Sequence, residues 1–141
     1  MLCLDDITAT VVDAAIKIHR DLGPGLFESV YEVVLTHALR RRGLEVERQH
    51  PVRFEYEGIT FDEGFRVDLL VERRVVIELK SLERVAPVHG KQVLTYLRLL
   101  GLPVGLLINF GAGTAKEGIR RIVNDLAPSE SPALRVNRPG P

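Results

Sequence analysis

The sequence predicts an α/β domain in which a mixed β-sheet is flanked by helices. Two stretches with helical apolar spacing come first, between residues 5 and 42, and a run of strand-like segments follows over 46–79. A third apolar helix, from Pro87 to about Gly101, leads to a buried strand over 104–109. Because strand, helix and strand in this order form a crossover, we expect 104–109 to lie parallel to another strand of the sheet.

The composition fits one compact domain. With 141 residues, of which 45% are hydrophobic, the chain can bury a sizeable core. We expect a single domain over residues 1–126 and a disordered, proline-rich tail over 127–141. The 19 basic and 19 acidic side chains balance, which argues against a protein that mainly coats nucleic acid. An enzyme with a local basic patch remains compatible with this balance.

Nothing in the sequence indicates a membrane protein. No apolar run approaches the roughly 20 residues of a membrane span. Residues 1–6 lack the basic and apolar regions of a signal peptide. Cys3 is the single cysteine, which excludes an internal disulfide and a multi-cysteine metal site. We therefore expect a cytoplasmic protein.

The first helix is expected to begin at Asp5 or Asp6, either of which could cap it, and to end at Gly23-Pro24-Gly25. One apolar stripe follows its length: Ile7, Val11, Ala14, Ala15, Ile18 and Leu22. Asp13 and His19 fall on or near the polar side of this helix. We expect both side chains to be solvated.

The second helix is expected over 27–42, with Gly43 after its end. Its apolar residues are Val30, Val33, Val34, Ala38 and Leu39. Glu28 lies in the first turn, where the helix dipole favours a carboxylate, and Tyr31 and Glu32 share its face. Taken alone, this pattern predicts a solvated stripe with an ordinary capping role.

Short strands connect the second helix to the centre of the sheet. Residues 46–49, 52–56 and 59–61 are typical of a meander, with an edge or bend at His50-Pro51. Near the other end of the domain, residues 119–123 form a closing element whose type the sequence does not decide.

Two polar features lie on and after the third helix. His89, Gln92 and Tyr96 share one of its faces by their spacing. Gly111 and Gly113 follow the last buried strand, but no Lys-Ser/Thr pair comes after them. A flexible turn is therefore expected there instead of a phosphate-binding loop.

The stretch 65–81 predicts a β-hairpin around the charged loop Glu72-Arg73-Arg74. Apolar residues alternate on both sides of this loop: Phe65, Val67, Leu69 and Val71 before it, and Val75, Ile77 and Leu79 after it. An odd loop length keeps both apolar sets on one face, and a loop of three residues pairs Val71 with Val75.

The same register sets Asp68 opposite Glu78, with Lys80 two residues further along that face. Opposed residues have Cβ atoms roughly 4.5–5.5 Å apart, so the two carboxylates repel. Leu70 and Val76 share this face, which indicates a sheet covered on both sides. Buried charges need compensation, and Mg²⁺ or Mn²⁺ would supply it. A Glu78–Lys80 ion pair on a wet sheet edge, with Asp68 solvated, is the alternative, and the hairpin alone leaves both open.

Four motifs in order resemble the GxxExxY protein family, a branch of the PD-(D/E)XK nuclease superfamily. They are Gly25–Tyr31, Arg66–Val71, Ile77–Lys80 and Gln92–Leu97. The resemblance covers about residues 7–123. It departs from the superfamily pattern at Val67, which replaces the proline of the superfamily's name, a change that many members share.

This resemblance implies a restriction-endonuclease-like core and a metal site for Mg²⁺ (or Mn²⁺). Asp68 and Glu78 resemble the metal-binding carboxylates, and the Leu79 carbonyl resembles a further ligand. Lys80 resembles the residue that orients or activates the attacking water. A cation held by the two carboxylates would lower the pKa of a bound water and polarise a phosphoryl oxygen.

The resemblance also assigns roles outside the hairpin. Glu28 is similar to an additional acidic residue that binds the metal directly or through water. Gln92 is similar to the polar residue that many members use beside the active site. The roles of Tyr31 and Tyr96 stay open between substrate contact and packing.

The resulting expectation is a metal-dependent nuclease that hydrolyses phosphodiester bonds of DNA or RNA, with DNA preferred. The alternative is a catalytically silent module that keeps the fold and binds nucleic acid or protein. Because the domain is small and its charge is balanced, it has little surface for clamping a duplex alone. We therefore expect a homodimer or a partner protein.

Overall fold

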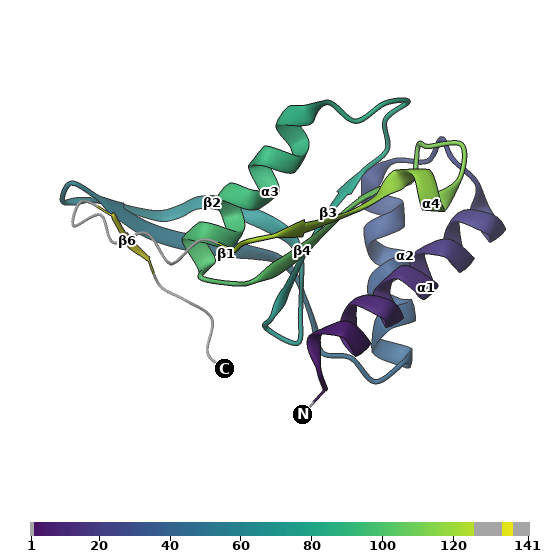
Figure 1. Ribbon diagram of the computed structural model, residues 1–141, viewed down its shortest axis with the longest axis horizontal. Helices are drawn as coiled ribbons and strands as arrows, with labels where there is room; N and C mark the ends of the chain where they lie inside the picture. The colour runs from purple at the N-terminus through teal and green to yellow at the C-terminus, as the bar shows by residue number, and fades with distance from the viewer. Residues whose placement is uncertain (1, 126–133, 137–141) are drawn as a thin grey trace.

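The computed structural model describes residues 2–125 and 134–136, which form a sheet with helices on both faces (Figure 1). The helices are α1 (Leu4–Leu22), α2 (Glu28–Arg41), α3 (Pro87–Leu100) and α4 (Ala115–Gly118). The strands are β1 (Val46–Tyr56), β2 (Ile59–Val71), β3 (Val75–Lys80), β4 (Val104–Asn109), β5 (Ile119–Val123) and β6 (Leu134–Val136). None of the described helices is long and apolar enough to cross a membrane.

The described strands form one mixed sheet in the order β5-β4-β3-β2-β1-β6. β3 and β4 run parallel and are joined through α3, whereas the other neighbouring pairs are antiparallel. The predicted fold class and the predicted parallel strand at 104–109 are both confirmed. The closing element that the sequence left undecided is the short helix α4 followed by the edge strand β5.

Two apolar clusters cover the two faces of the sheet. α1 and α2 pack on one face and α3 packs on the other (Figure 1). On β3, Val75, Ile77 and Leu79 point to the α1–α2 side, while Val76 points to α3. Successive side chains of a strand alternate between faces, so β3 and β4 are buried on both sides and read as nearly continuous apolar runs.

The start of α1 and two of its side chains differ from the prediction. Cys3 occupies the N-cap position without a side-chain cap, so Asp5 and Asp6 lie inside the first turn. Leu22 is 47% exposed at the end of the predicted apolar stripe. His19, predicted to be solvated, is buried, and its Nε2 lies 2.9 Å from the Ala112 carbonyl oxygen. The loop after β4 covers His19, a long-range contact that helical periodicity does not reveal.

The buried face of α2 also differs from the predicted one. Val30 and Val33 are 38% and 51% exposed, whereas Tyr31 and Glu32 are buried. The other buried residues of this helix are Leu35, Thr36 and Leu39. The solvated stripe predicted for Glu28, Tyr31 and Glu32 is therefore wrong for two of its three members, because the contact with the sheet sets the orientation of the helix.

The predicted meander strands merge into two long strands. β1 has 11 residues and passes through His50-Pro51 without ending, and β2 has 13 residues. Together they form an arm that extends beyond the helices (Figure 1). β6 pairs with β1 along this arm, at Phe54↔Val136 through Tyr56↔Leu134. These three residues of β6 belong to the predicted disordered tail, while 127–133 and 137–141 lie outside the described residues.

The end of β4 fixes the backbone that follows Lys80. The Asn109 side chain accepts hydrogen bonds from the N–H groups of Leu82 (2.9 Å) and Gly111 (3.1 Å). Its amide nitrogen donates to the Leu82 carbonyl at 2.9 Å. The turn at Gly111 is therefore packed tightly against Leu82, where the sequence predicted a flexible turn.

We expect Gly111→Ala to destabilise the fold by about 3 kcal/mol, because added atoms in a packed site force the backbone apart. A Cβ at this position would lie 2.2 Å from the Leu82 carbonyl oxygen and 2.6 Å from its nitrogen. Gly113→Ala is the matched control, since the nearest atom to its Cβ would be a Glu117 carboxylate oxygen at 3.9 Å. Urea denaturation would compare the two variants, and equal midpoints would contradict the expectation.

Candidate active site

The site lies where β2 and β3 separate. The ladder follows the predicted register, with Val71↔Val75, Leu70↔Val76 and Leu69↔Ile77. Beyond Leu69 the side chains take over the pairing: the Asp68 N–H donates to Glu78 Oε1 at 3.0 Å, and the Leu79 N–H donates to Asp68 Oδ2 at 2.8 Å. The predicted proximity of Asp68 and Glu78 thus appears as one hydrogen bond, from the Asp68 N–H to the Glu78 carboxylate, beside a second one from the Leu79 N–H to the Asp68 carboxylate.

The alternation of β2 breaks at Asp68. Leu69 belongs to the apolar cluster on the α1–α2 side, whereas Val67 and Phe65 pack into the cluster beneath α3. Residues two apart in a regular strand share a face. The prediction that all four apolar residues of this strand share one face is therefore wrong for Phe65 and Val67, because the strand is irregular at Asp68.

Burial and a second negative charge make the site electrostatically unusual. Glu78 is 6% exposed. Its burial, and secondarily the charge of Asp68, raise the pKa of the Glu78 carboxyl to about 8. The hydrogen bond from the Asp68 N–H and the charge of Lys80 favour ionisation of Glu78, but they offset only part of the rise in its pKa.

Backbone geometry directs the Leu79 carbonyl toward the same place. The N–H and C=O of one residue in an extended strand point to the same side. The Leu79 N–H faces Asp68, and the Lys80 carbonyl faces the opposite side, where it accepts from the Phe110 N–H at 2.8 Å. The Leu79 carbonyl therefore faces the gap between β2 and β3.

α3 brings polar side chains to the other side of Lys80. Gln92, His89 and Lys91 line a surface pocket together with Lys80. The pocket thus joins two residues that the sequence predicted for the site, Lys80 and Gln92.

Tyr96 on α3 lies near enough to the carboxylate pair to be affected by its charge. Its ring stacks on Phe65, with centroids 4.1 Å apart. Burial raises the pKa of the Tyr96 hydroxyl above its usual range, and the charges of Glu78 and Asp68 raise it further. Tyr96 therefore combines a packing contact with a hydroxyl in the electric field of the site.

The two other motif residues of α2 behave differently from each other. Tyr31 is buried, stacks on Phe110 at 4.2 Å and donates to the Gly23 carbonyl at 2.5 Å, so it has a packing role. Glu28 is exposed and lines a shallow pocket with Ser81, the residue after Lys80. Within residues 2–125 and 134–136, no group of three or more His, Cys, Asp or Glu side chains is arranged to hold a metal ion.

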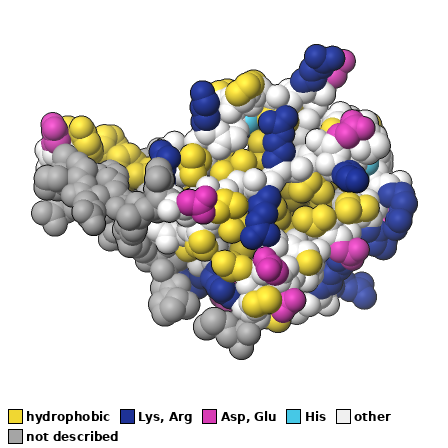
Figure 2. All heavy atoms as spheres, in the orientation of Figure 1, with side chains coloured by type: hydrophobic (Ala, Val, Ile, Leu, Met, Phe, Trp, Pro, Cys, Tyr) yellow, Lys and Arg dark blue, Asp and Glu magenta, His cyan; other side chains and the backbone are white. Residues whose placement is uncertain are grey.

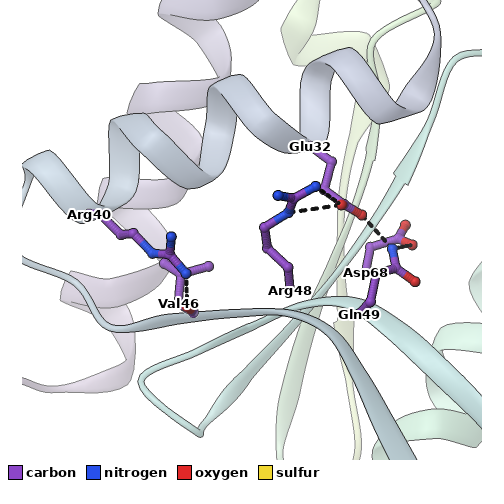
Figure 3. Close-up of polar contacts among 6 residues, drawn as sticks. All are labelled: Glu32, Arg40, Val46, Arg48, Gln49 and Asp68. Atoms are coloured by element: carbon purple, nitrogen blue, oxygen red, sulfur yellow. Dashed lines mark hydrogen bonds and ion pairs between the residues drawn. The ribbon is translucent and has the colours of Figure 1, made fainter.

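One contact of Asp68 was missed by the sequence analysis. Gln49 Nε2 lies 3.3 Å from Asp68 Oδ1 and 2.5 Å from Glu32 Oε1, so an amide bridges two carboxylates (Figure 3). The spacing in the sequence had already placed Glu28 and Glu32 on the same face of the second helix. No local signal marks Gln49, because its partners lie 17 and 19 residues away in the chain.

Residues 5–122 match the model of the PD-(D/E)XK nuclease superfamily, and the chain belongs to this superfamily. Its mixed sheet flanked by helices is the restriction-endonuclease-like fold that the sequence predicted. Members of the superfamily are generally nucleases that use divalent metal ions, so the domain is nuclease-like. No curated protein and no solved structure matches the chain.

Proposed function

We propose that this protein is a Mg²⁺- or Mn²⁺-dependent nuclease of the GxxExxY branch that hydrolyses phosphodiester bonds. The observation that carries the proposal is that two carboxylates meet at one place: the buried Glu78 accepts from the Asp68 N–H, and the Asp68 carboxylate accepts from the Leu79 N–H. Two carboxylates held together with incomplete compensation destabilise a fold unless a cation joins them.

The residues present fit a hard divalent cation. Asp68, Glu78 and the Leu79 carbonyl offer oxygen ligands around one gap, and such cations prefer oxygen. Glu28, exposed near Ser81, would reach the ion through water. When bound, the ion would lower the pKa of a water molecule and polarise a phosphoryl oxygen.

The chain's own groups would complete the chemistry. The Lys80 ammonium would orient the attacking water and stabilise the negative charge that develops on the phosphoryl oxygens. Gln92, in the same pocket, would hold the phosphate or the water by hydrogen bonds. The Leu79 N–H keeps one oxygen of Asp68 fixed at 2.8 Å, which would hold this carboxylate in place for the ion.

The surface supports a substrate contact that is local. Figure 2 shows Lys and Arg side chains scattered over one face among acidic and apolar ones, without a continuous basic track. We propose DNA, in preference to RNA, as the substrate, bound by a homodimer or together with a partner protein. A cytoplasmic location fits this role.

A second candidate is a catalytically silent module that binds nucleic acid or protein. It is favoured by the position of Glu28, which stands apart from the Asp68–Glu78 pair, since the described residues contain no group of three potential metal-binding side chains. This module would bind its partner without metal-dependent turnover.

Cleavage of a panel of single-stranded, duplex and branched DNA and RNA, with Mn²⁺, Mg²⁺ or EDTA, separates the two candidates. We expect metal-dependent cutting by the wild type and a loss of about 10²–10³-fold in Lys80→Ala, because a charge that stabilises the transition state is removed. Lys17→Ala is the matched control, since Lys17 pairs with Asp21 on the surface of α1. No cutting by the wild type, or equal cutting by Lys80→Ala, would favour the binding module.

A further inference from the structure

We propose that Gln49 is a positioning residue that fixes the Asp68 carboxylate for metal binding, and that Glu32 on α2 anchors it. This inference rests on the proposed function, because Asp68 is taken as a metal ligand. Gln49 and Glu32 are not among the site residues that the four motifs predict.

The Gln49 amide matches its two partners chemically. An amide nitrogen carries two N–H groups, and both neighbours are carboxylates, which accept hydrogen bonds when ionised. One N–H donates to Glu32 Oε1 at 2.5 Å and the other to Asp68 Oδ1 at 3.3 Å (Figure 3). Because Leu79 donates to Asp68 Oδ2, both oxygens of Asp68 have a fixed donor.

Glu32 is held firmly enough to serve as an anchor. Arg48 donates to Glu32 Oε2 through Nε at 3.1 Å and through Nη2 at 2.9 Å (Figure 3). Glu32 is only 7% exposed, and a buried charge needs partners. Arg48 compensates the charge at one oxygen, and the Gln49 amide donates to the other. The helix α2 therefore holds the amide from the side opposite to Asp68.

The backbone at Gln49 is adapted to this bridge. Its φ is 50°, a left-handed conformation that is uncommon for a residue other than glycine and unusual inside a strand. The β1–β2 ladder pairs Arg48 with Leu69 and His50 with Val67, so Gln49 lies at the level of Asp68. Such conformations persist where surrounding contacts enforce them, and they cluster at functional sites.

The strand pairing on both sides of Asp68 is thus irregular at the level of this residue. On one side β1 turns left-handed at Gln49, and on the other side the β2–β3 ladder ends at Leu69. The carboxylate is oriented by hydrogen bonds in place of regular strand pairing. Groups that orient a ligating side chain in this way typically contribute about 10- to 100-fold to metal affinity or activity.

Isothermal titration with Mn²⁺ and cleavage kinetics on the same preparations test the inference. We expect Gln49→Ala to weaken Mn²⁺ binding about 10-fold and to lower kcat similarly, with KM for nucleic acid changed less than about twofold. Gln49→Gly removes the same amide but accepts the left-handed backbone without strain, so it should fold more stably and lose the same Mn²⁺ affinity. Arg53→Ala, an exposed position on the same strand, is the control and should match the wild type.

Each outcome decides a different question. Wild-type Mn²⁺ affinity in Gln49→Ala, or affinity restored by Gln49→Gly, would overturn the positioning role, because the amide would then be dispensable. No Mn²⁺ binding by the wild type would overturn the proposed function and this inference with it. Weaker binding in both variants, with Arg53→Ala unchanged, would establish the role of the amide.

Discussion

Asp68→Asn is expected to abolish metal-dependent cleavage, with a loss of about 10³-fold or more. The loss should exceed the 10- to 100-fold typical of a residue that only supports a ligand, because a charged ligand itself is removed. Asparagine keeps the size of the side chain and one oxygen for the Leu79 N–H. Cleavage rates over a range of Mn²⁺ concentrations, together with Mn²⁺ titration, would measure the effect.

The same variant should not lose stability in EDTA. Removing the Asp68 charge takes away a repulsion that raises the pKa of Glu78, so we expect the metal-free Asp68→Asn domain to be as stable as the wild type or more stable. Function and stability would then change in opposite directions, as expected for a site whose charges destabilise the fold. A variant that is both inactive and unfolded in thermal denaturation would contradict this explanation.

Glu78 predicts a pH dependence of stability in the metal-free protein. The pKa of Glu78 is about 8 in the folded state, against 4.5 for an unperturbed group. Between these values the folded protein binds a proton that the unfolded chain has released, so the free energy of unfolding falls as the pH rises. The contribution is fully present below pH 4.5 and is lost as the pH passes through about 8, with a magnitude of up to about 5 kcal/mol.

Glu78→Gln should remove this dependence, because glutamine does not titrate. Urea denaturation in EDTA between pH 5 and pH 9 would compare the two proteins. We expect similar stability near pH 5 and a growing advantage of Glu78→Gln toward pH 9. Parallel curves would show that Glu78 does not carry a perturbed pKa, and that the buried pair is compensated by other groups.

The part of the site predicted from the sequence depends on local geometry. The loop Glu72-Arg73-Arg74 and the period-2 pattern around it fix the register, and this register brings Asp68 near Glu78. Both facts concern residues close together in the chain. The parallel arrangement of β3 and β4 follows similarly from chain order and the length of the connecting helix.

The features that the sequence did not predict depend on contacts between distant segments. Three features depend on where a neighbouring element lies. They are the rotation of α2 that buries Glu32, the loop that covers His19 and the hydrogen bonds of the Gln49 amide. Gln49 is also an exception to strand preferences, since its positive φ contradicts the local pattern. Such exceptions are where local rules fail, and in this chain one of them lies beside the proposed catalytic pair.

The separation of β2 from β3 has a mechanical consequence. Asp68 belongs to the long β1–β2 arm, whereas Glu78 and Lys80 belong to β3, which is paired along its whole length with β4. The two carboxylates therefore lie on opposite sides of the gap between β2 and β3, where hydrogen bonds to side-chain carboxylates connect the two strands. The way in which the β1–β2 arm is seated against β3 therefore sets the spacing of the proposed metal ligands.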